Sequence, residues 1–182
     1  MSEPVNLKQA SFLYESLHGE KPPKGFFNKE DISKLSHADL VTIGARWLRY
    51  NKNCSIVVEE PATAGFVKPD ILGFQVYSSF MIEVKVSKSD FLADKKKKGY
   101  DQKIADYSYY LVPSDLIDES DVKNGYGLIY ATSKKWKDFI VVKHPERSDK
   151  PVNDWVHKVI FHSLLLKNNI RGHFKSNGEK NK

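Results

Sequence analysis

The spacing of apolar residues along the chain predicts a helix followed by three consecutive strands. Between residues 36 and 50, apolar side chains recur every three or four positions and polar side chains occupy the opposite side, as is typical of an amphipathic helix. Three segments rich in β-branched and aromatic residues follow at short intervals, at 54–60, 67–74 and 79–86. We expect these segments to form a meander of neighbouring strands.

The rest of the chain predicts further helices and strands. Ser87 and Asp90 have the spacing of a helix capping box and predict a helix that ends near residue 98. A second helical stretch is expected over residues 101–106. The remaining predicted elements are strands at 107–112, 125–132 and 138–144, a short helix within 113–122, and a final helix that begins at Pro151 and Val152. This succession predicts an α/β fold with a sheet flanked by helices.

Length and composition indicate one folded domain. The chain has 182 residues, of which 40% are apolar and 12% aromatic, enough for a sizeable core. We expect an N-terminal arm at 1–30 with a short helix near 7–17, one domain at 31–168, and a basic, disordered tail at 169–182. The sequence contains no run of about 18 apolar residues, the length that a membrane-spanning helix requires. Its single cysteine fits a reducing compartment. We therefore expect a cytoplasmic protein without membrane association.

The balance of charge and the distribution of histidines narrow the classes of site. The 29 basic residues exceed the 23 acidic ones, and the formal net charge of +6 is compatible with a polyanionic partner. His157 and His162 are five positions apart, whereas two zinc ligands on one helix face are separated by four. We therefore predict no zinc site.

Two charged residues lie within the apolar strand predicted at 79–86. Because side chains alternate along a strand, Glu83 and Lys85 share one face, while Ile82, Val84 and Val86 are expected to point the other way, into the core. Burial of an unpaired charge costs several kcal/mol. These charges therefore require a partner, a metal ion or a function.

The predicted hairpin brings a further acid to this strand. If the segments 67–74 and 79–86 pair in antiparallel fashion around a turn centred between Val76 and Tyr77, Asp70 lies opposite Glu83, with their Cβ atoms about 5 Å apart. Two carboxylates at that separation repel each other unless a cation lies between them, and carboxylate oxygens are preferred ligands of Mg²⁺. The pairing therefore predicts a site for a divalent cation.

The pattern formed by Pro69-Asp70 and Glu83-Val84-Lys85 resembles the signature of the PD-(D/E)xK nuclease superfamily. The resemblance covers about residues 36–132. It is closer to MmcB-type bacterial and phage DNA-repair endonucleases, through the segments EVKVSKSDFLADKKK and YSYYLVPSDLI. It implies a restriction-endonuclease-like core with a central mixed sheet flanked by helices. From the resemblance we also expect a metal-dependent deoxyribonuclease that acts as an endonuclease in DNA repair, recombination or phage DNA metabolism.

The resemblance also implies a role for each residue of the signature. Asp70 and Glu83, helped by the backbone carbonyl of Val84, would hold Mg²⁺ or Mn²⁺. Lys85 would lie beside the attacking water. These three charged side chains are the expected catalytic residues.

Other residues are weaker candidates for the same site. A third carboxylate is common in this superfamily, and Glu60 is our first choice for it. Asp39 is the competitor, although its position three residues after Ser36 also fits a helix cap. Gln102, followed by Tyr107, resembles a Q-x3-Y element of related nucleases, but the spacing here is one residue longer.

The expected partner is DNA, with RNA and a homodimer left open. Lysines after the signature strand are expected to contact phosphates, although cations at a helix C-terminus also favour the helix dipole. These lysines are Lys88, Lys95, Lys96, Lys97 and Lys98. The alternative function is a non-catalytic module on a nuclease fold that binds DNA or a protein partner. The presence of all three charged signature residues favours the enzyme.

Overall fold

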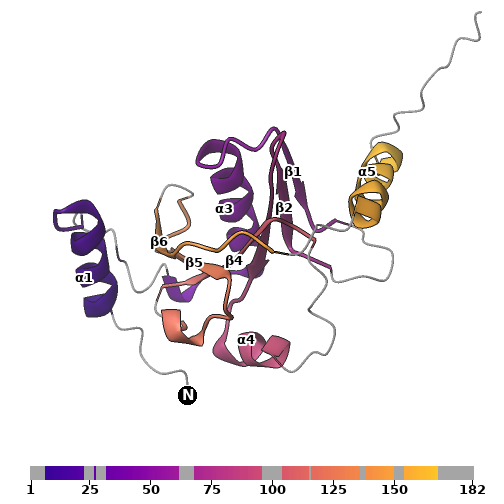
Figure 1. Ribbon diagram of the computed structural model, residues 1–182. Coiled ribbons are helices and arrows are strands. Elements are labelled where there is room, and N and C mark those ends of the chain that lie inside the picture. Colours follow the sequence, from indigo (N-terminus) through magenta and orange to yellow (C-terminus); the bar gives the residue numbers. More distant parts are fainter. Residues whose placement is uncertain are drawn as a thin grey trace, which may run out of the picture.

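The centre of the fold is a six-stranded mixed sheet with the strand order β1-β2-β3-β4-β5-β6 (Figure 1). The computed structural model describes residues 7–22, 27, 32–61, 68–95, 104–114, 116–135, 138–149 and 154–167. The strands are β1 (Ile56–Glu59), β2 (Ile71–Phe74), β3 (Ser79–Val84), β4 (Tyr107–Pro113), β5 (Tyr126–Ala131) and β6 (Phe139–Lys143). β3, β4 and β5 are parallel, and the other neighbouring strands are antiparallel. The predicted α/β fold with a mixed sheet is confirmed.

Helices cover both faces of this sheet. They are α1 (Leu7–His18), α3 (His37–Tyr50), α4 (Lys88–Lys95) and α5 (Asp154–Lys167), with a short 3₁₀ helix at Glu119–Asp121. α3 packs on one face, while Phe91 of α4 and Ile160 of α5 belong to the core on the other face. α1 and α5 lie beyond opposite edges of the sheet, α5 beside β1 and β2 (Figure 1). Within the described ranges, no helix is long and apolar enough to cross a membrane.

Helix α3 forms as its polarity pattern predicts. Ser36 is the N-cap, and its hydroxyl and backbone N–H exchange hydrogen bonds with Asp39 in a capping box. The apolar side of the helix is buried against the sheet. The approach is close at Gly44, where an added Cβ would lie 2.5 Å from Cδ1 of Ile71 in β2. A glycine at this position therefore allows the helix to pack directly on β2.

The predicted meander and its turn are confirmed, with shorter strands than expected. β1, β2 and β3 pair in sequence, and Ile71 lies opposite Ile82. The N–H of Gln75 donates to the carbonyl of Ser78 across the turn, whose tip exposes Val76 and Tyr77. The hairpin is therefore centred where the sequence predicts it.

Strand β3 departs from the prediction in the burial of its two faces. All six of its residues are buried, because α3 covers one face and α4 lies over the other. Strands in the middle of a sheet covered on both sides are buried on both faces. The expectation that Val86 points into the core is wrong, since β3 ends at Val84 and Val86 is 37% exposed.

The helical stretch predicted over 101–106 is not present in its described part, residues 104–106. Asp106 instead joins the start of β3 to the C-terminal segment. Its carboxylate accepts hydrogen bonds of 2.8 Å from both the N–H and the hydroxyl of Ser79, and it pairs with Arg147 at 3.3 Å. Residues 101–103 and the predicted tail at 169–182 lie outside the described residues, as does most of the predicted arm beyond α1.

Gly127 is expected to be the least replaceable of the buried strand glycines. A Cβ there would lie 2.5 and 2.7 Å from ring atoms of Tyr109 and 2.8 Å from the backbone carbonyl of Lys143. Because neither a packed ring nor a backbone carbonyl can rotate away, Gly127→Ala should lower the free energy of unfolding by about 1 to 3 kcal/mol. Urea denaturation followed by circular dichroism measures this change.

The matched control is Gly73→Ala in β2. Its Cβ would meet the sulfur of Cys54 at 2.9 Å and a methyl carbon of Leu48 at 3.0 Å, and these are ends of flexible side chains. We expect Gly73→Ala to lower the free energy of unfolding by less than Gly127→Ala does. Equal stability of Gly127→Ala and the unmodified protein would contradict the close packing of Tyr109 on this glycine.

Candidate functional site

The candidate site lies where β2 begins and β3 ends. Asp70 directly precedes β2, and its Oδ2 accepts a hydrogen bond of 2.7 Å from the backbone N–H of Val84, the last residue of β3. The paired residues of β2 and β3 run from Phe74 and Ser79 to Ile71 and Ile82, and the same register extended by one step would place Asp70 opposite Glu83. The predicted register is therefore confirmed, and it brings these two acids to the same end of the hairpin.

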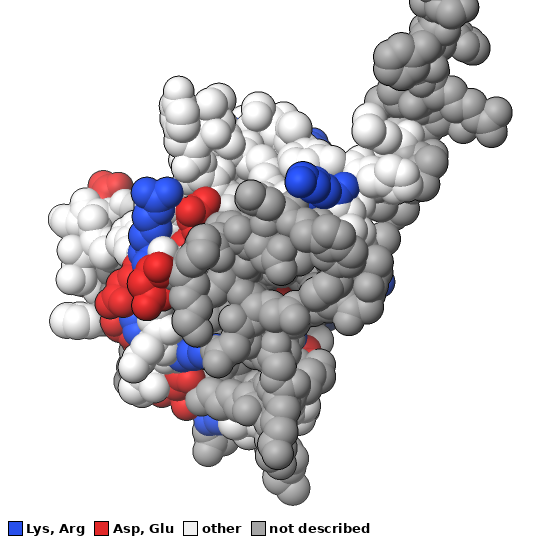
Figure 2. All heavy atoms as spheres, turned by 45° about the vertical axis from the view of Figure 1, so that its right-hand side comes forward, with Lys and Arg blue, Asp and Glu red and all other residues white. Residues whose placement is uncertain are grey.

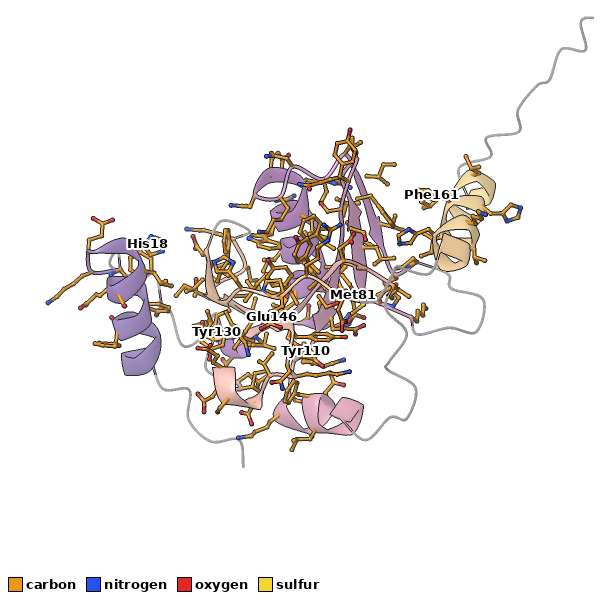
Figure 3. The ribbon with its side chains drawn as sticks, viewed as in Figure 1. His18, Met81, Tyr110, Tyr130, Glu146 and Phe161 are labelled. Atoms are coloured by element: carbon orange, nitrogen blue, oxygen red, sulfur yellow. The ribbon has the colours of Figure 1, made fainter. Side chains whose placement is uncertain are left out.

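Glu83 and Lys85 form a buried pair on one face of the sheet. The Nζ of Lys85 lies 3.8 Å from Oε2 of Glu83, and their side chains are only 8% and 3% exposed. Glu83 is the register partner of Tyr110 in β4, whose ring meets Phe91 of α4 edge-on at 5.2 Å. Figure 3 shows Tyr110 between the sheet and α4. The two charges share a face, as predicted, but α4 and the neighbouring aromatic rings bury that face.

A histidine that the sequence analysis did not select completes the surroundings of Asp70. His37 is the first residue of α3, and its Nε2 lies 3.2 Å from Oδ1 of Asp70. The side chains of His37 and Asp70 are 42% and 20% exposed. Leu40, Val41 and Gly44 form the sheet-facing stripe of α3, and one more step of three residues towards the N-terminus reaches His37. That extension of the helical stripe is the signal that would have identified it.

Glu60 is placed next to the backbone of Asp70. Its N–H donates to the carbonyl of Asp70 at 2.7 Å, and its φ of 45° is left-handed. Because this conformation interrupts the strand after Glu59, alternation along β1 does not determine where the Glu60 side chain points. Glu59 and Glu60 are both exposed. Among the described residues, no group of three or more histidine, cysteine, aspartate or glutamate side chains is arranged to hold a metal ion.

Asp39 acts as the acid of the α3 cap. Its Oδ2 accepts hydrogen bonds from the N–H and the hydroxyl of Ser36 at 2.9 and 2.7 Å, and Nζ of Lys134 lies 3.3 Å away. The hydrogen bonds from Ser36, the backbone one foremost, lower the pKa of Asp39 below its usual value of 3.8. The capping interpretation is confirmed.

The predicted DNA-contacting lysines lie in and after α4. Lys88 is exposed at the start of α4, directly after the signature strand. Lys95 ends α4, while Lys96 to Lys98 and Gln102 lie outside the described residues. In the view of Figure 2, the described basic side chains are interspersed with acidic ones and form no continuous basic patch.

Buried polar residues gather where the three parallel strands end. Lys85 follows β3, Ser114 follows β4 and Thr132 follows β5, and all three are buried. In α/β sheets, ligands commonly bind outside the carboxyl ends of the strands. The polar end of this sheet therefore coincides with the position of the candidate site.

The donors at the site suit a hard divalent cation. Asp70 and Glu83 offer carboxylate oxygens, and Val84, whose carbonyl is the third predicted donor, follows Glu83 in the sequence and donates its N–H to Asp70. Mg²⁺ is commonly held by one or two carboxylates and retains several waters, so a set of two acids satisfies its coordination chemistry. The residues therefore fit Mg²⁺ or Mn²⁺.

Comparison with known proteins supports the fold. No family model and no curated protein matches the chain. The structure is similar to that of a protein of unknown function from Silicibacter pomeroyi, with a TM-score of 0.56 and 23% sequence identity over 76% of this chain and 90% of that one. At this level of identity the likeness shows a shared fold.

Asp39→Ala should destabilise the protein by about 1 kcal/mol, because it removes the acid of the capping box. The pKa of Asp39 is lowered by folding, so its contribution is present above the usual value of 3.8 and is lost as the pH falls through the lower folded value. The difference in urea midpoint between the two proteins should therefore shrink below about pH 4.

The variant Lys134→Ala is the control, because it removes the ion pair and leaves the cap. An exposed pair of this kind contributes between about 0 and 1 kcal/mol. If the difference in urea midpoint between Asp39→Ala and the unmodified protein persists unchanged at pH 2.5, the capping role of the ionised carboxylate is contradicted.

Proposed function

We propose that this protein is a divalent-metal-dependent nuclease that hydrolyses phosphodiester bonds in DNA. The observation that carries the proposal is the hydrogen bond from the N–H of Val84 to Asp70, which places Asp70 at the end of β3 beside the residue that follows Glu83. Lys85 lies 3.8 Å from Glu83 on the same face. This is the order of residues in the PD-(D/E)xK signature, and the mixed sheet is compatible with a restriction-endonuclease-like core.

Asp70, Glu83 and the carbonyl of Val84 would hold Mg²⁺ or Mn²⁺. When bound, such an ion lowers the pKa of a coordinated water and neutralises charge on a phosphate oxygen. Lys85 supplies a fixed positive charge beside Glu83, where it would stabilise negative charge that develops on the phosphate. Because α4 covers this face, the ammonium acts in an environment of low dielectric, which strengthens its electrostatic effect.

Contacts to DNA would come from lysines near the end of β3. Lys88 lies three residues after Lys85 and is exposed, and the run that continues from Lys95 to Lys98 would extend the contact to the phosphates. The choice of DNA over RNA rests on the family resemblance. The proposal includes a biological role in DNA repair, recombination or phage DNA metabolism. It also includes a homodimer as the oligomeric state.

The test is a cleavage assay on a panel of single-stranded, duplex, nicked and branched DNA. We expect cleavage with Mg²⁺ or Mn²⁺, none with a chelator, and none for Asp70→Asn, because this variant replaces a charged oxygen donor by an amide. Glu60→Gln tests the third carboxylate, with the exposed Glu59→Gln as its control. An unmodified protein that binds DNA but cleaves no member of the panel would favour the non-catalytic alternative.

Lys85→Met should reduce cleavage by about 10² to 10³ and leave Mn²⁺ binding intact, because the ammonium acts on developing charge and is not a ligand. Its burial against Glu83 adds a second expectation. Loss of one partner of a buried ion pair costs about 3 to 5 kcal/mol, so the thermal midpoint should also fall.

The cleavage rates are therefore compared at a temperature below the thermal midpoint of the Lys85→Met variant. Lys143→Met in β6 is the control. Unchanged turnover in a folded Lys85→Met variant would remove Lys85 from the mechanism. Loss of Mn²⁺ binding together with cleavage would show that Lys85 acts by maintaining the position of Glu83.

A further inference from the structure

His37 is the polar end of the buried stripe of α3. Leu40, Val41 and Gly44 follow it at three, four and seven residues and face the sheet. Leu40 and Val41 are buried, whereas the side chain of His37, the first residue of α3, is 42% exposed. The helical period thus directs the imidazole towards the start of β2.

Two constraints hold this imidazole beside Asp70. At the helix start, the capping box of Ser36 and Asp39 sets the backbone that enters α3. Two turns later, Gly44 brings the helix against Ile71, the residue that follows Asp70. The position of His37 relative to Asp70 therefore depends on the packing of α3 and does not require the histidine contact itself.

The contact with His37 complements the one made by Val84. The N–H of Val84 donates to Oδ2 of Asp70 at 2.7 Å, and Nε2 of His37 lies 3.2 Å from Oδ1. A carboxylate oxygen only accepts, so Nε2 carries the hydrogen in this contact. With one donor on each oxygen, the plane of the carboxylate is fixed, and each oxygen retains a lone pair for a further partner.

We propose that His37 is a positioning residue that orients the carboxylate of Asp70 for binding a divalent cation, an inference that rests on the proposed function. Donors that hold a ligating side chain in place typically contribute 10- to 100-fold to metal affinity. A solitary surface contact of a half-exposed histidine would contribute almost nothing. The two accounts therefore differ in a quantity that can be measured without any substrate.

The experiment is calorimetric titration of the full chain with Mn²⁺ alone. His37→Ala should weaken binding by about 10- to 100-fold. His37→Gln should restore most of the affinity, because its side-chain amide presents an N–H donor at about the reach of Nε2. His162→Ala removes an exposed histidine from α5 and should leave the affinity unchanged.

A second readout reports on Asp70 without any metal. The amide resonance of Val84 should shift in His37→Ala, since the carboxylate that accepts its hydrogen bond is free to turn, and should return towards its original position in His37→Gln. Thermal midpoints of the variants establish that each is folded.

The outcomes separate this inference from the function on which it rests. If the unmodified protein binds no Mn²⁺, the proposed metal centre fails, and the role of His37 fails with it. If the unmodified protein binds Mn²⁺ and His37→Ala binds it equally well, or if His37→Gln is as weak as His37→Ala, only the positioning role is overturned.

Discussion

The arrangement of the site depends on the pairing of β2 with β3. The turn between them determines which residues face each other, and Asp70 meets the N–H of Val84 because of that register. A slip by one residue would turn every side chain of a strand to the opposite face and remove the contact between Asp70 and Val84. The packing of Ile71 and Ile82 under α3 makes such a slip costly, since both are completely buried. The core of the protein thus maintains the geometry of its polar end.

The burial of Glu83 and Lys85 is the second constraint. Both faces of β3 are covered, so the two charges lie in an environment where neither is stable alone. A hydrophobic pair of similar size would commonly be no less stable. Stability alone therefore gives no reason for two charges at the carboxyl end of this parallel strand, which is consistent with the proposed function.

Local sequence patterns predicted much of the secondary structure. The hairpin turn, the cap of α3 and the positions of the strands follow from period and turn chemistry, which act between neighbours in the chain. The helix predicted over 101–106 is not present in its described part, 104–106, where Asp106 bonds to Ser79, a residue 27 positions earlier. The position of Glu60 could not be derived from alternation, since a left-handed backbone conformation ends the strand before it.

The α/β fold, the register of β2 and β3, and the common face of Glu83 and Lys85 could all be predicted from the amino-acid sequence. These features depend on periodicities of two and about 3.6 residues, which can be read along the chain. The burial of the charged face by α4 and the contact between His37 and Asp70 could not be predicted from local patterns. Both outcomes depend on how separate helices pack on the sheet, and packing joins residues that are distant in sequence.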